Sequence, residues 1–166
     1  MNIIQADSSH IPDIQKIAIK SWEVTYSDIL SQEQFDYMIE MMYSYDALNK
    51  QMAEQKHHFL LIRDQASSGY CGFVSYELNY KNQTKTKIHK LYLLPECKGK
   101  GMGRMLIEKV ILLARSAENS HVSLNMNRNN KSLGFYKQMG FEIVGEEDIN
   151  IGNGYLMEDY IFEKKI

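Results

Sequence analysis

Apolar and polar residues repeat with two different periods along this chain, and each change of period marks an expected element. Helical spacing of apolar residues predicts a first helix, which Ser8 or Ser9 can cap and which carries Ile14, Ile17, Ala18 and Trp22 on its buried face. The same spacing predicts helices over 31–43, 103–117 and 131–139, and leaves a further helix over 47–55 open. Short runs of strand-forming residues predict strands over 2–6, 57–63, 70–80, 84–94, 121–127, 141–147 and 155–163.

Turn-forming residues separate these segments, for example over 64–69 and 81–83. Gly140 is expected to end the helix before it, and the last two strands are expected to be antiparallel. The order β-αα-βββ-α-β-α-ββ is that of an α+β fold with a mixed, mostly antiparallel central sheet flanked by helices. Because no repeat, linker or low-complexity segment interrupts it, we expect a single domain over 1–166.

Composition narrows the class of protein. A hydrophobic content of 44% and a charged content of 24% are typical of a soluble globular chain. The net charge of −2 gives no reason to expect a nucleic-acid partner. Neither a signal peptide nor an apolar run long enough for a membrane is visible, so a cytoplasmic location without a membrane partner is expected. Cys71 and Cys97 show no metal-ligand spacing, so we expect two reduced thiols and no metal site.

Chemistry is indicated by a glycine-rich loop between an expected strand and an expected helix. The strand over 84–94 ends at Pro95, and Gly99, Gly101 and Gly103 follow at alternate positions. Such a loop lets backbone N–H groups approach a phosphate, and the helix dipole favours its charge. Lys98, Lys100 and Arg104 add positive charge. The spacing fits neither a P-loop nor a dinucleotide fingerprint, but it predicts a phosphorylated ligand.

Two segments resemble the cofactor motifs of the GNAT superfamily of N-acetyltransferases. Lys98-Gly-Lys-Gly101-Met-Gly103 resembles the pyrophosphate loop Gln/Arg-x-x-Gly-x-Gly/Ala, with Lys in the first place. Asn129-Asn-Lys-Ser132-Leu-Gly-Phe-Tyr136-Lys-Gln-Met-Gly140-Phe141 resembles the second segment, Asn-x-x-Ala/Ser-x-x-x-Tyr-x-x-x-Gly-Phe. The resemblance implies the GNAT fold, acetyl-CoA as co-substrate, and transfer of acetyl directly to a primary amine.

The resemblance also assigns roles to residues. It implies that the loop binds pyrophosphate through Lys98, Gly99, Lys100, Gly101, Met102, Gly103 and Arg104. It implies that the edge formed by Leu91, Tyr92 and Leu93 pairs with the pantetheine amides through main-chain groups. In the second segment it places cofactor contacts at Asn129, Ser132 and Tyr136, and makes Tyr136 the general acid for the leaving thiolate.

The general base is less sharply indicated. His89 lies on the expected central strand two residues before Leu91, so the two side chains share a face. Many relatives carry a glutamate near this position, and a histidine with its ordinary pKa near 6.5 suits the same role. An ordinary hydrogen-bonded strand histidine is the alternative interpretation. Glu23, Glu77 and a bound water are other candidates for the base.

The acceptor is indicated by charge and aromatic residues. Residues 7–54 hold nine acidic residues against three lysines, and residues 142–163 hold seven acidic residues and no Lys or Arg. Trp22 and Tyr26 lie one helical turn apart with Glu23 between them, a set that suits an ammonium group, although Trp22 also fits a core position. The segment 151–164 resembles the end of bacterial spermidine/spermine-type acetyltransferases.

The expected substrate is therefore a small-molecule amine, with a polyamine or another small cationic amine as the candidate. A protein N-terminus or lysine side chain remains an alternative acceptor. A non-catalytic acyl-CoA sensor of the same fold is the rival function, and a homodimer is compatible with the sequence.

Overall fold

The structure is a computed structural model that describes residues 1–65 and 68–166. The expected turn over 64–69 includes residues 66–67, which lie outside the described residues. The helices and strands follow one another as β1 (Asn2–Gln5), α1 (Ile11–Tyr26), α2 (Gln32–Tyr43), α3 (Tyr45–Ala53), β2 (His58–Arg63), β3 (Gly72–Glu77), β4 (Lys85–Leu93), α4 (Met102–Ser116), β5 (His121–Asn127), α5 (Leu133–Gln138), β6 (Glu142–Gly152) and β7 (Tyr155–Lys165).

The strand order is β1-β2-β3-β4-β5-β7-β6, and β4 pairs with β5 in parallel while the other registered pairs are antiparallel. This confirms the predicted α+β fold with a mostly antiparallel sheet flanked by helices. The structure contains α3, the helix that the sequence left open, so three helices rather than two separate β1 from β2. The chain divides into two units: the first unit is Met1–Glu77 with Lys90–Val110, and the second is Leu78–His89 with Ile111–Ile166.

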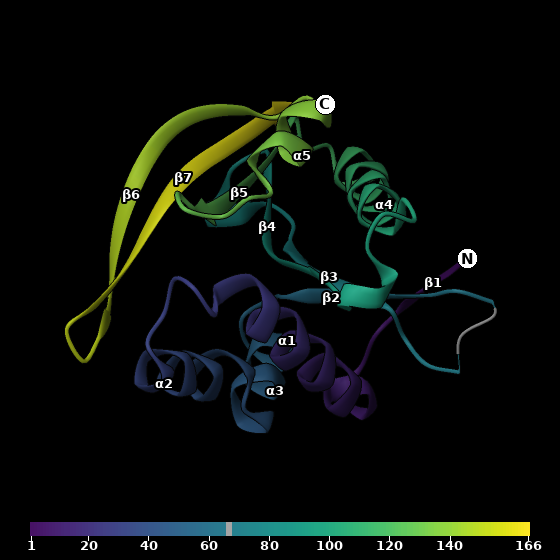
Figure 1. Cartoon of the computed structure of the whole chain (residues 1–166). Helices are drawn as coiled ribbons and strands as arrows, with labels where there is room; N and C mark the ends of the chain where they lie inside the picture. Colours follow the sequence, from purple (N-terminus) through teal and green to yellow (C-terminus); the bar gives the residue numbers. More distant parts are fainter. Residues whose placement is uncertain (66–67) are drawn as a thin grey trace. The chain divides into compact units, whose positions relative to one another are not determined.

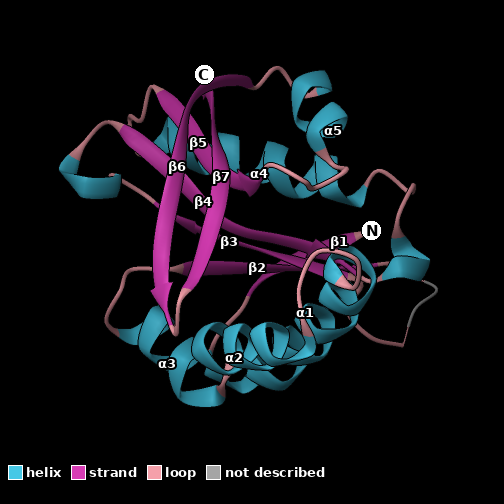
Figure 2. Ribbon diagram, turned by 60° about the vertical axis from the view of Figure 1, so that its left-hand side comes forward, coloured by secondary structure: helices cyan, strands magenta, loops and turns pink. Residues whose placement is uncertain are grey.

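In the first unit, α1 packs its apolar stripe against the strands. Ile14, Ile17 and Ala18 are almost completely buried, as the helical spacing predicted. Ile11, at the start of the helix, is buried as well, and α1 contacts β3. The sheet contributes Phe59 from β2 and Phe73 from β3, which are also almost completely buried in this unit. Each such side chain contributes about 1.5–3 kcal/mol by leaving water. The helices α1, α2 and α3 lie next to one another in Figure 2.

Side-chain caps determine where the first helices begin. The prediction that Ser8 or Ser9 caps the first helix is wrong, because both residues lie in a 3₁₀ turn that leads into α1. Asp7 caps this turn instead, and its Oδ1 accepts the N–H of Ser9 at 2.9 Å. An aspartate is as good an N-cap as serine, and here it sits where the extended chain ends. Ser31, which the sequence placed at the start of the second helix, caps α2 by accepting the N–H of Gln34 at 3.2 Å.

The second unit is built around a long hairpin of β6 and β7 (Figure 1). The strand β5 pairs with β7 over the whole of His121–Asn127 and with β4 over Lys85–Ile88. Asn153 and Gly154 join β6 to β7 with φ angles of 51° and 76°, the left-handed conformation of a two-residue hairpin turn. The expected end of β6 at residue 147 is therefore wrong, because the strand continues to Gly152.

Two local features hold the second unit's loops. Gly140 ends α5 with φ of 81°, and the N–H of Phe141 donates to the carbonyl oxygen of Tyr136 at 3.0 Å, as expected for a glycine C-cap. Asn119, which is 4% exposed, forms hydrogen bonds with Asn79 in the loop after β3. Its Oδ1 accepts the hydroxyl of Thr86 at 2.7 Å and the N–H of Asn79 at 3.1 Å, and its Nδ2 donates to Asn79 Oδ1 at 2.6 Å.

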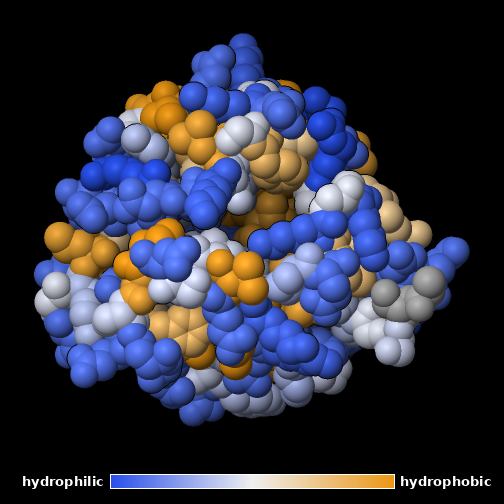
Figure 3. Space-filling model, viewed as in Figure 1, coloured by the Kyte–Doolittle hydropathy of each residue, from blue (hydrophilic) through white to orange (hydrophobic). Residues whose placement is uncertain are grey.

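On the face that Figure 3 shows, hydrophilic residues predominate and hydrophobic residues form small groups. Among the described residues, no helix has the length and apolar character needed to cross a membrane. In the part of the chain that the structure describes, the exposed large hydrophobic residues include Met1, Ile19, Val24, Met41, Tyr45, Leu112, Ile143, Val144 and Leu156.

Candidate active site

The glycine loop lies in the first unit, between the turn at Pro95–Cys97 and α4. Gly99 and Gly101 both have φ of 78°, a conformation that side-chain-bearing residues rarely adopt. The carbonyl oxygen of Gly101 accepts the N–H of Met105 at 3.1 Å, so this glycine opens the helix. A Cβ atom added at Gly99 or Gly101 would meet no atom within 4 Å, so the space beside the loop backbone is open. The loop therefore presents exposed backbone at a helix N-terminus, which suits a phosphate.

Cations surround this loop. Lys98 and Lys100 are exposed, and Arg104 stands in the first turn of α4. The Arg104 guanidinium lies 4.0 Å from the Glu108 carboxylate, and both side chains are more than half exposed. An ion pair of this length and exposure contributes little, so Arg104 is available to an incoming anion.

An aromatic cluster in the first unit includes Tyr92, a residue of the expected pantetheine edge. The Trp22 ring lies 4.6 Å from the Tyr26 ring, 5.6 Å from Tyr43 and 6.2 Å from Tyr92, measured between ring centroids. Trp22 is 3% exposed, so the core interpretation of this residue holds, while Tyr26 and Tyr92 are half-buried. Burial raises the pKa of Tyr43 and Tyr92, so both phenols are neutral at physiological pH. Glu23 is exposed on α1.

A buried lysine lies beside the same cluster, and sequence reasoning missed it. Lys90 is 9% exposed, and its Nζ donates to Gln51 Oε1 at 2.7 Å. Gln51 Nε2 in turn donates to the carbonyl oxygen of Met42 at 2.9 Å. The Lys90 ammonium also lies 5.6 Å from the centroid of the Tyr43 ring. Burial lowers the pKa of Lys90 to about 8, because it removes water from the ammonium group, and the neutral amide of Gln51 supplies no opposite charge.

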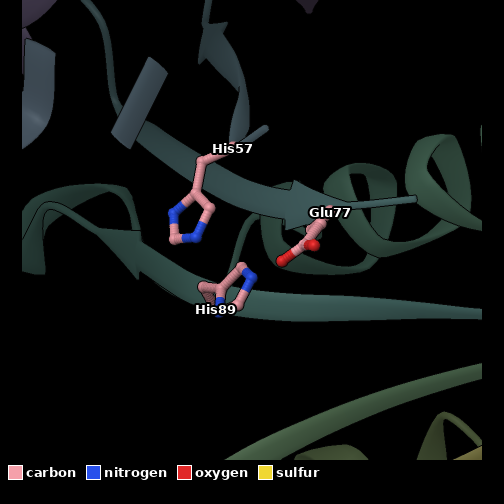
Figure 4. A group of neighbouring side chains, drawn as sticks. All are labelled: His57, Glu77 and His89. Atoms are coloured by element: carbon pink, nitrogen blue, oxygen red, sulfur yellow. The ribbon is translucent and has the colours of Figure 1, made fainter. Parts of the chain in front are cut away.

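His57 and Glu77 lie at the same end of the strand pair β2–β3. The last registered pair there is His58 with Tyr76. His57 directly precedes β2 and Glu77 is the last residue of β3; Figure 4 draws both side chains. Burial, and then the charge of Lys90, lowers the pKa of His57 to about 4, while burial raises the pKa of Glu77. His57 is therefore neutral at physiological pH. The sequence offered no signal for His57, because its environment is created by residues distant in the chain.

His89, also drawn in Figure 4, lies on β4. It is the last residue of Leu78–His89, the first of the two segments that form the second unit. It is half-buried, and its ring meets the Tyr80 ring edge-on with 5.8 Å between centroids. The alternation of burial along β4 puts Ile88 and Lys90 inward and leaves His89 and Leu91 more exposed, as the strand period predicted.

The second expected cofactor segment forms a turn followed by a short helix. Asn127 Oδ1 accepts the N–H of Asn129 at 2.9 Å, so Asn129 is a turn residue rather than the helix cap. Ser132 occupies the N-cap position of α5, and its side chain makes no capping hydrogen bond. Tyr136 is 9% exposed and packs near the rings of Phe141 and Phe162, at 6.1 and 5.8 Å.

The acidic hairpin of the second unit is partly neutralised. Arg128 Nη2 lies 2.6 Å from Asp148 Oδ1 and 3.7 Å from Glu146 Oε2. A second network crosses the strands, in which Lys87 Nζ donates to Asn125 Oδ1, and Asn125 Nδ2 donates to Glu147 Oε2 at 3.0 Å. The charge count over 142–163 did not include these two cations, because Lys87 lies on β4 and Arg128 directly follows β5.

Comparison with known proteins identifies the family. The family model described as "Acetyltransferase (GNAT) domain" matches residues 26–158. This chain belongs to the GNAT acetyltransferase family. A spermidine N(1)-acetyltransferase of Thermoplasma acidophilum is 26% identical over 146 residues, which is 86% of each chain. The peptidyl-lysine N-acetyltransferase YjaB of Salmonella typhimurium is 32% identical over 74 residues, 43% of this GNAT chain and about half, 48%, of that relative's length.

Solved structures share the GNAT fold over the whole chain. The PaiA N-acetyltransferase of Thermoplasma acidophilum, solved in complex with coenzyme A, has a TM-score of 0.80 and 24% identity and covers 100% of both chains. A GCN5-related N-acetyltransferase of Rhodopseudomonas palustris has a TM-score of 0.82 and 18% identity, and covers 99% of this chain and 95% of its own. At these identities the likeness establishes the fold.

Proposed function

We propose that this GNAT protein transfers an acetyl group from acetyl-CoA directly to a primary amine. The observation that carries the proposal is the exposed loop from Lys98 to Gly101, with left-handed Gly99 and Gly101, followed by the first turn of α4 with Met102, Gly103 and the exposed Arg104. This loop would hold the pyrophosphate, and the main chain of Leu91, Tyr92 and Leu93 would pair with the pantetheine arm. Asn129 and Ser132 are proposed as further cofactor contacts.

In the proposed reaction the amine nitrogen attacks the thioester carbonyl carbon. A C–N bond forms, the C–S bond breaks, and the leaving CoA thiolate takes a proton from the hydroxyl of Tyr136. The attacking amine must lose its extra proton before or during attack, because a primary amine near pKa 10 is mostly protonated at neutral pH. Tyr136 keeps its proton until the thiolate forms, since a phenol is a weak acid at neutral pH.

We propose His89, directly or through a water, as the base that accepts the amine proton. Its half-buried position at the exposed face of β4 supports this role, and its contact with the Tyr80 ring fixes the imidazole. Glu77 remains the alternative, because its raised pKa makes it a better base than an ordinary carboxylate. His89→Gln should flatten the acidic limb of the pH profile of kcat/KM. An unchanged profile would assign the proton to another group.

For the acceptor we propose a small cationic amine, with a polyamine as the leading candidate. The exposed carboxylates of the β6–β7 hairpin and the spermidine acetyltransferase relative support this choice. Tyr26, with Trp22 behind it and Glu23 on the same helix, is proposed as part of the acceptor pocket. The peptidyl-lysine acetyltransferase relative favours a lysine side chain as the second candidate.

A panel of acceptors decides between these candidates. Release of the CoA thiol is measured with spermidine, spermine, simple alkyl amines and short lysine peptides, each against a control without acceptor. Polyamines should give at least a tenfold higher kcat/KM than alkyl amines at low ionic strength. Equal values for both would exclude the polyamine proposal, and turnover only with peptides would favour the lysine candidate.

We also propose that the chain forms a single domain over 1–166, that it is cytoplasmic without a nucleic-acid or membrane partner, and that it is a homodimer. Light scattering of the purified protein tests the homodimer.

A further inference from the structure

Gly72 is the first residue of β3, and the space that a side chain would need there is already occupied by β4. An added Cβ atom would lie 2.2 Å from Leu93 Cδ2, 2.7 Å from the carbonyl oxygen of Tyr92 and 3.3 Å from Leu93 Cα. The leucine side chain could rotate away, but Tyr92 O and Leu93 Cα are backbone atoms. Any side chain at Gly72 therefore requires β4 itself to move.

Hydrogen bonds on the residue before Gly72 keep the two strands at this distance. The N–H of Leu94 donates to the carbonyl oxygen of Cys71 at 2.7 Å, and the N–H of Cys71 donates to the carbonyl oxygen of Ile62 at 2.8 Å. The end of β4 is thus tied to β2 through the residue next to Gly72. Gly72 is absent from the residues with positive φ in the described chain, so glycine is needed here for space rather than for backbone conformation.

The backbone that meets Gly72 is the same segment that the proposed function offers to the cofactor. We propose that Gly72 is a positioning residue for coenzyme A: by having no side chain, it allows Tyr92 and Leu93 to lie against β3 and sets the place of the main-chain groups that pair with the pantetheine arm. This inference rests on the proposed function, because it assumes that the ligand pairs with Leu91, Tyr92 and Leu93.

The size of the expected effect follows from the contact distances. To bring a new Cβ to an ordinary contact, Tyr92 O must retreat from 2.7 Å to about 3.4 Å. A hydrogen bond near 2.9 Å that lengthens by this amount is no longer a hydrogen bond. Loss of one pantetheine hydrogen bond in Gly72→Ala should weaken CoA binding about tenfold, which corresponds to about 1.4 kcal/mol.

The test measures CoA affinity by calorimetry and the KM values for acetyl-CoA and for the best amine. Gly72→Ala should raise the dissociation constant of CoA and the KM of acetyl-CoA about tenfold, with the KM of the amine within twofold of wild type. Gly69→Ala is the matched control, because a Cβ atom there meets nothing within 4 Å, and its affinity for CoA should stay within twofold of wild type. A general loss of stability would change both KM values or neither, so the split between them identifies positioning.

A second variant covers the possibility that Gly72→Ala does not fold. Leu93→Ala in the Gly72→Ala background removes the 2.2 Å clash and leaves the backbone clash with Tyr92 O. This double variant, compared with Leu93→Ala alone, should still bind CoA about tenfold more weakly. Folded variants that bind CoA like their reference proteins would overturn the inference. Wild-type protein that binds no CoA would instead overturn the proposed function.

Discussion

The glycine loop gives a prediction in which backbone strain and ligand binding can be separated. Gly101 in the loop and Gly154 in the β6–β7 turn have φ of 78° and 76°, and an added Cβ atom meets nothing within 4 Å at either position. Gly101→Ala and Gly154→Ala therefore impose the same kind of backbone strain in equally open surroundings. Only Gly101 lies where the phosphate is expected.

The magnitudes follow from these geometries. A left-handed alanine costs about 1–2 kcal/mol, so both variants should lose this much stability without ligand. For a chain of this length each kcal/mol lowers Tm by about 2–4 °C. CoA at about 100 times its dissociation constant should stabilise wild type and Gly154→Ala by about 2.7 kcal/mol. If the new methyl group at Gly101 weakens binding about tenfold, the same CoA concentration should stabilise Gly101→Ala by only about 1.4 kcal/mol.

Differential scanning fluorimetry with and without CoA measures both effects on the same samples. The two variants should melt alike without ligand, and Gly101→Ala should gain about half as much from CoA as Gly154→Ala. Equal gains in the two variants would refute a phosphate site at Gly101. Gly101→Val would be a poorer test, because a β-branched residue at φ of 78° adds strain of its own.

Three further predictions concern catalysis, pH and stability. Tyr136→Phe keeps the ring that packs in the core but removes the proposed acid, so kcat should fall about 100-fold or more with the KM of acetyl-CoA unchanged; an unchanged kcat would exclude this acid. Because burial lowers the pKa of Lys90 to about 8, the unfolded chain binds more protons above that pH, and the free energy of unfolding should rise with pH from about 8 to 9.5. Lys90→Met should reduce this slope by up to about 1.4 kcal/mol per pH unit in urea titrations, and an equal slope would contradict the burial argument. Asn119→Ala should lower the free energy of unfolding in urea by about 2–4 kcal/mol, because Thr86 and Asn79 lose their hydrogen-bond partner. A decrease below about 0.5 kcal/mol would show that these hydrogen bonds do not stabilise the fold.

The fold was largely predictable because its elements carry strong local signals. The stripe of α1 and the alternation along β4 are periodic, and His121–Asn127 was predicted with its observed bounds. The end of β6 was missed although the signal was present. Asn153-Gly154 is a two-residue hairpin sequence, and both residues adopt the positive φ that such a turn requires, so it places the strand end at Gly152.

The candidate site was predictable only where chemistry is encoded in a short segment. The loop over 98–104 combines glycines, cations and a helix start within seven residues, so its interpretation needed no tertiary information. Lys90 and His57 carried no such signal. Burial lowers the pKa of both residues, and the charge of Lys90 lowers the pKa of His57 further. Lys90 lies more than thirty residues along the chain from His57 and from its hydrogen-bond partner Gln51, so local sequence does not indicate these contacts. Trp22 was noticed in the sequence, but its role was open, since an aromatic residue on a helix fits both a pocket wall and a core position. Its exposed fraction of 3% in the structure favours the core position.

The most direct test of the account is a measurement of acetylated product and free CoA from the same reaction. Purified protein, acetyl-CoA and spermidine are incubated, and the acetylated amine is quantified by mass spectrometry beside the released thiol, with Tyr136→Phe as the control. Direct acetyl transfer with Tyr136 as the acid predicts equal amounts of the two products from wild type and a loss of both in the variant. Tight CoA binding without acetylation of spermidine or of any other amine would contradict it and identify the protein as an acyl-CoA sensor.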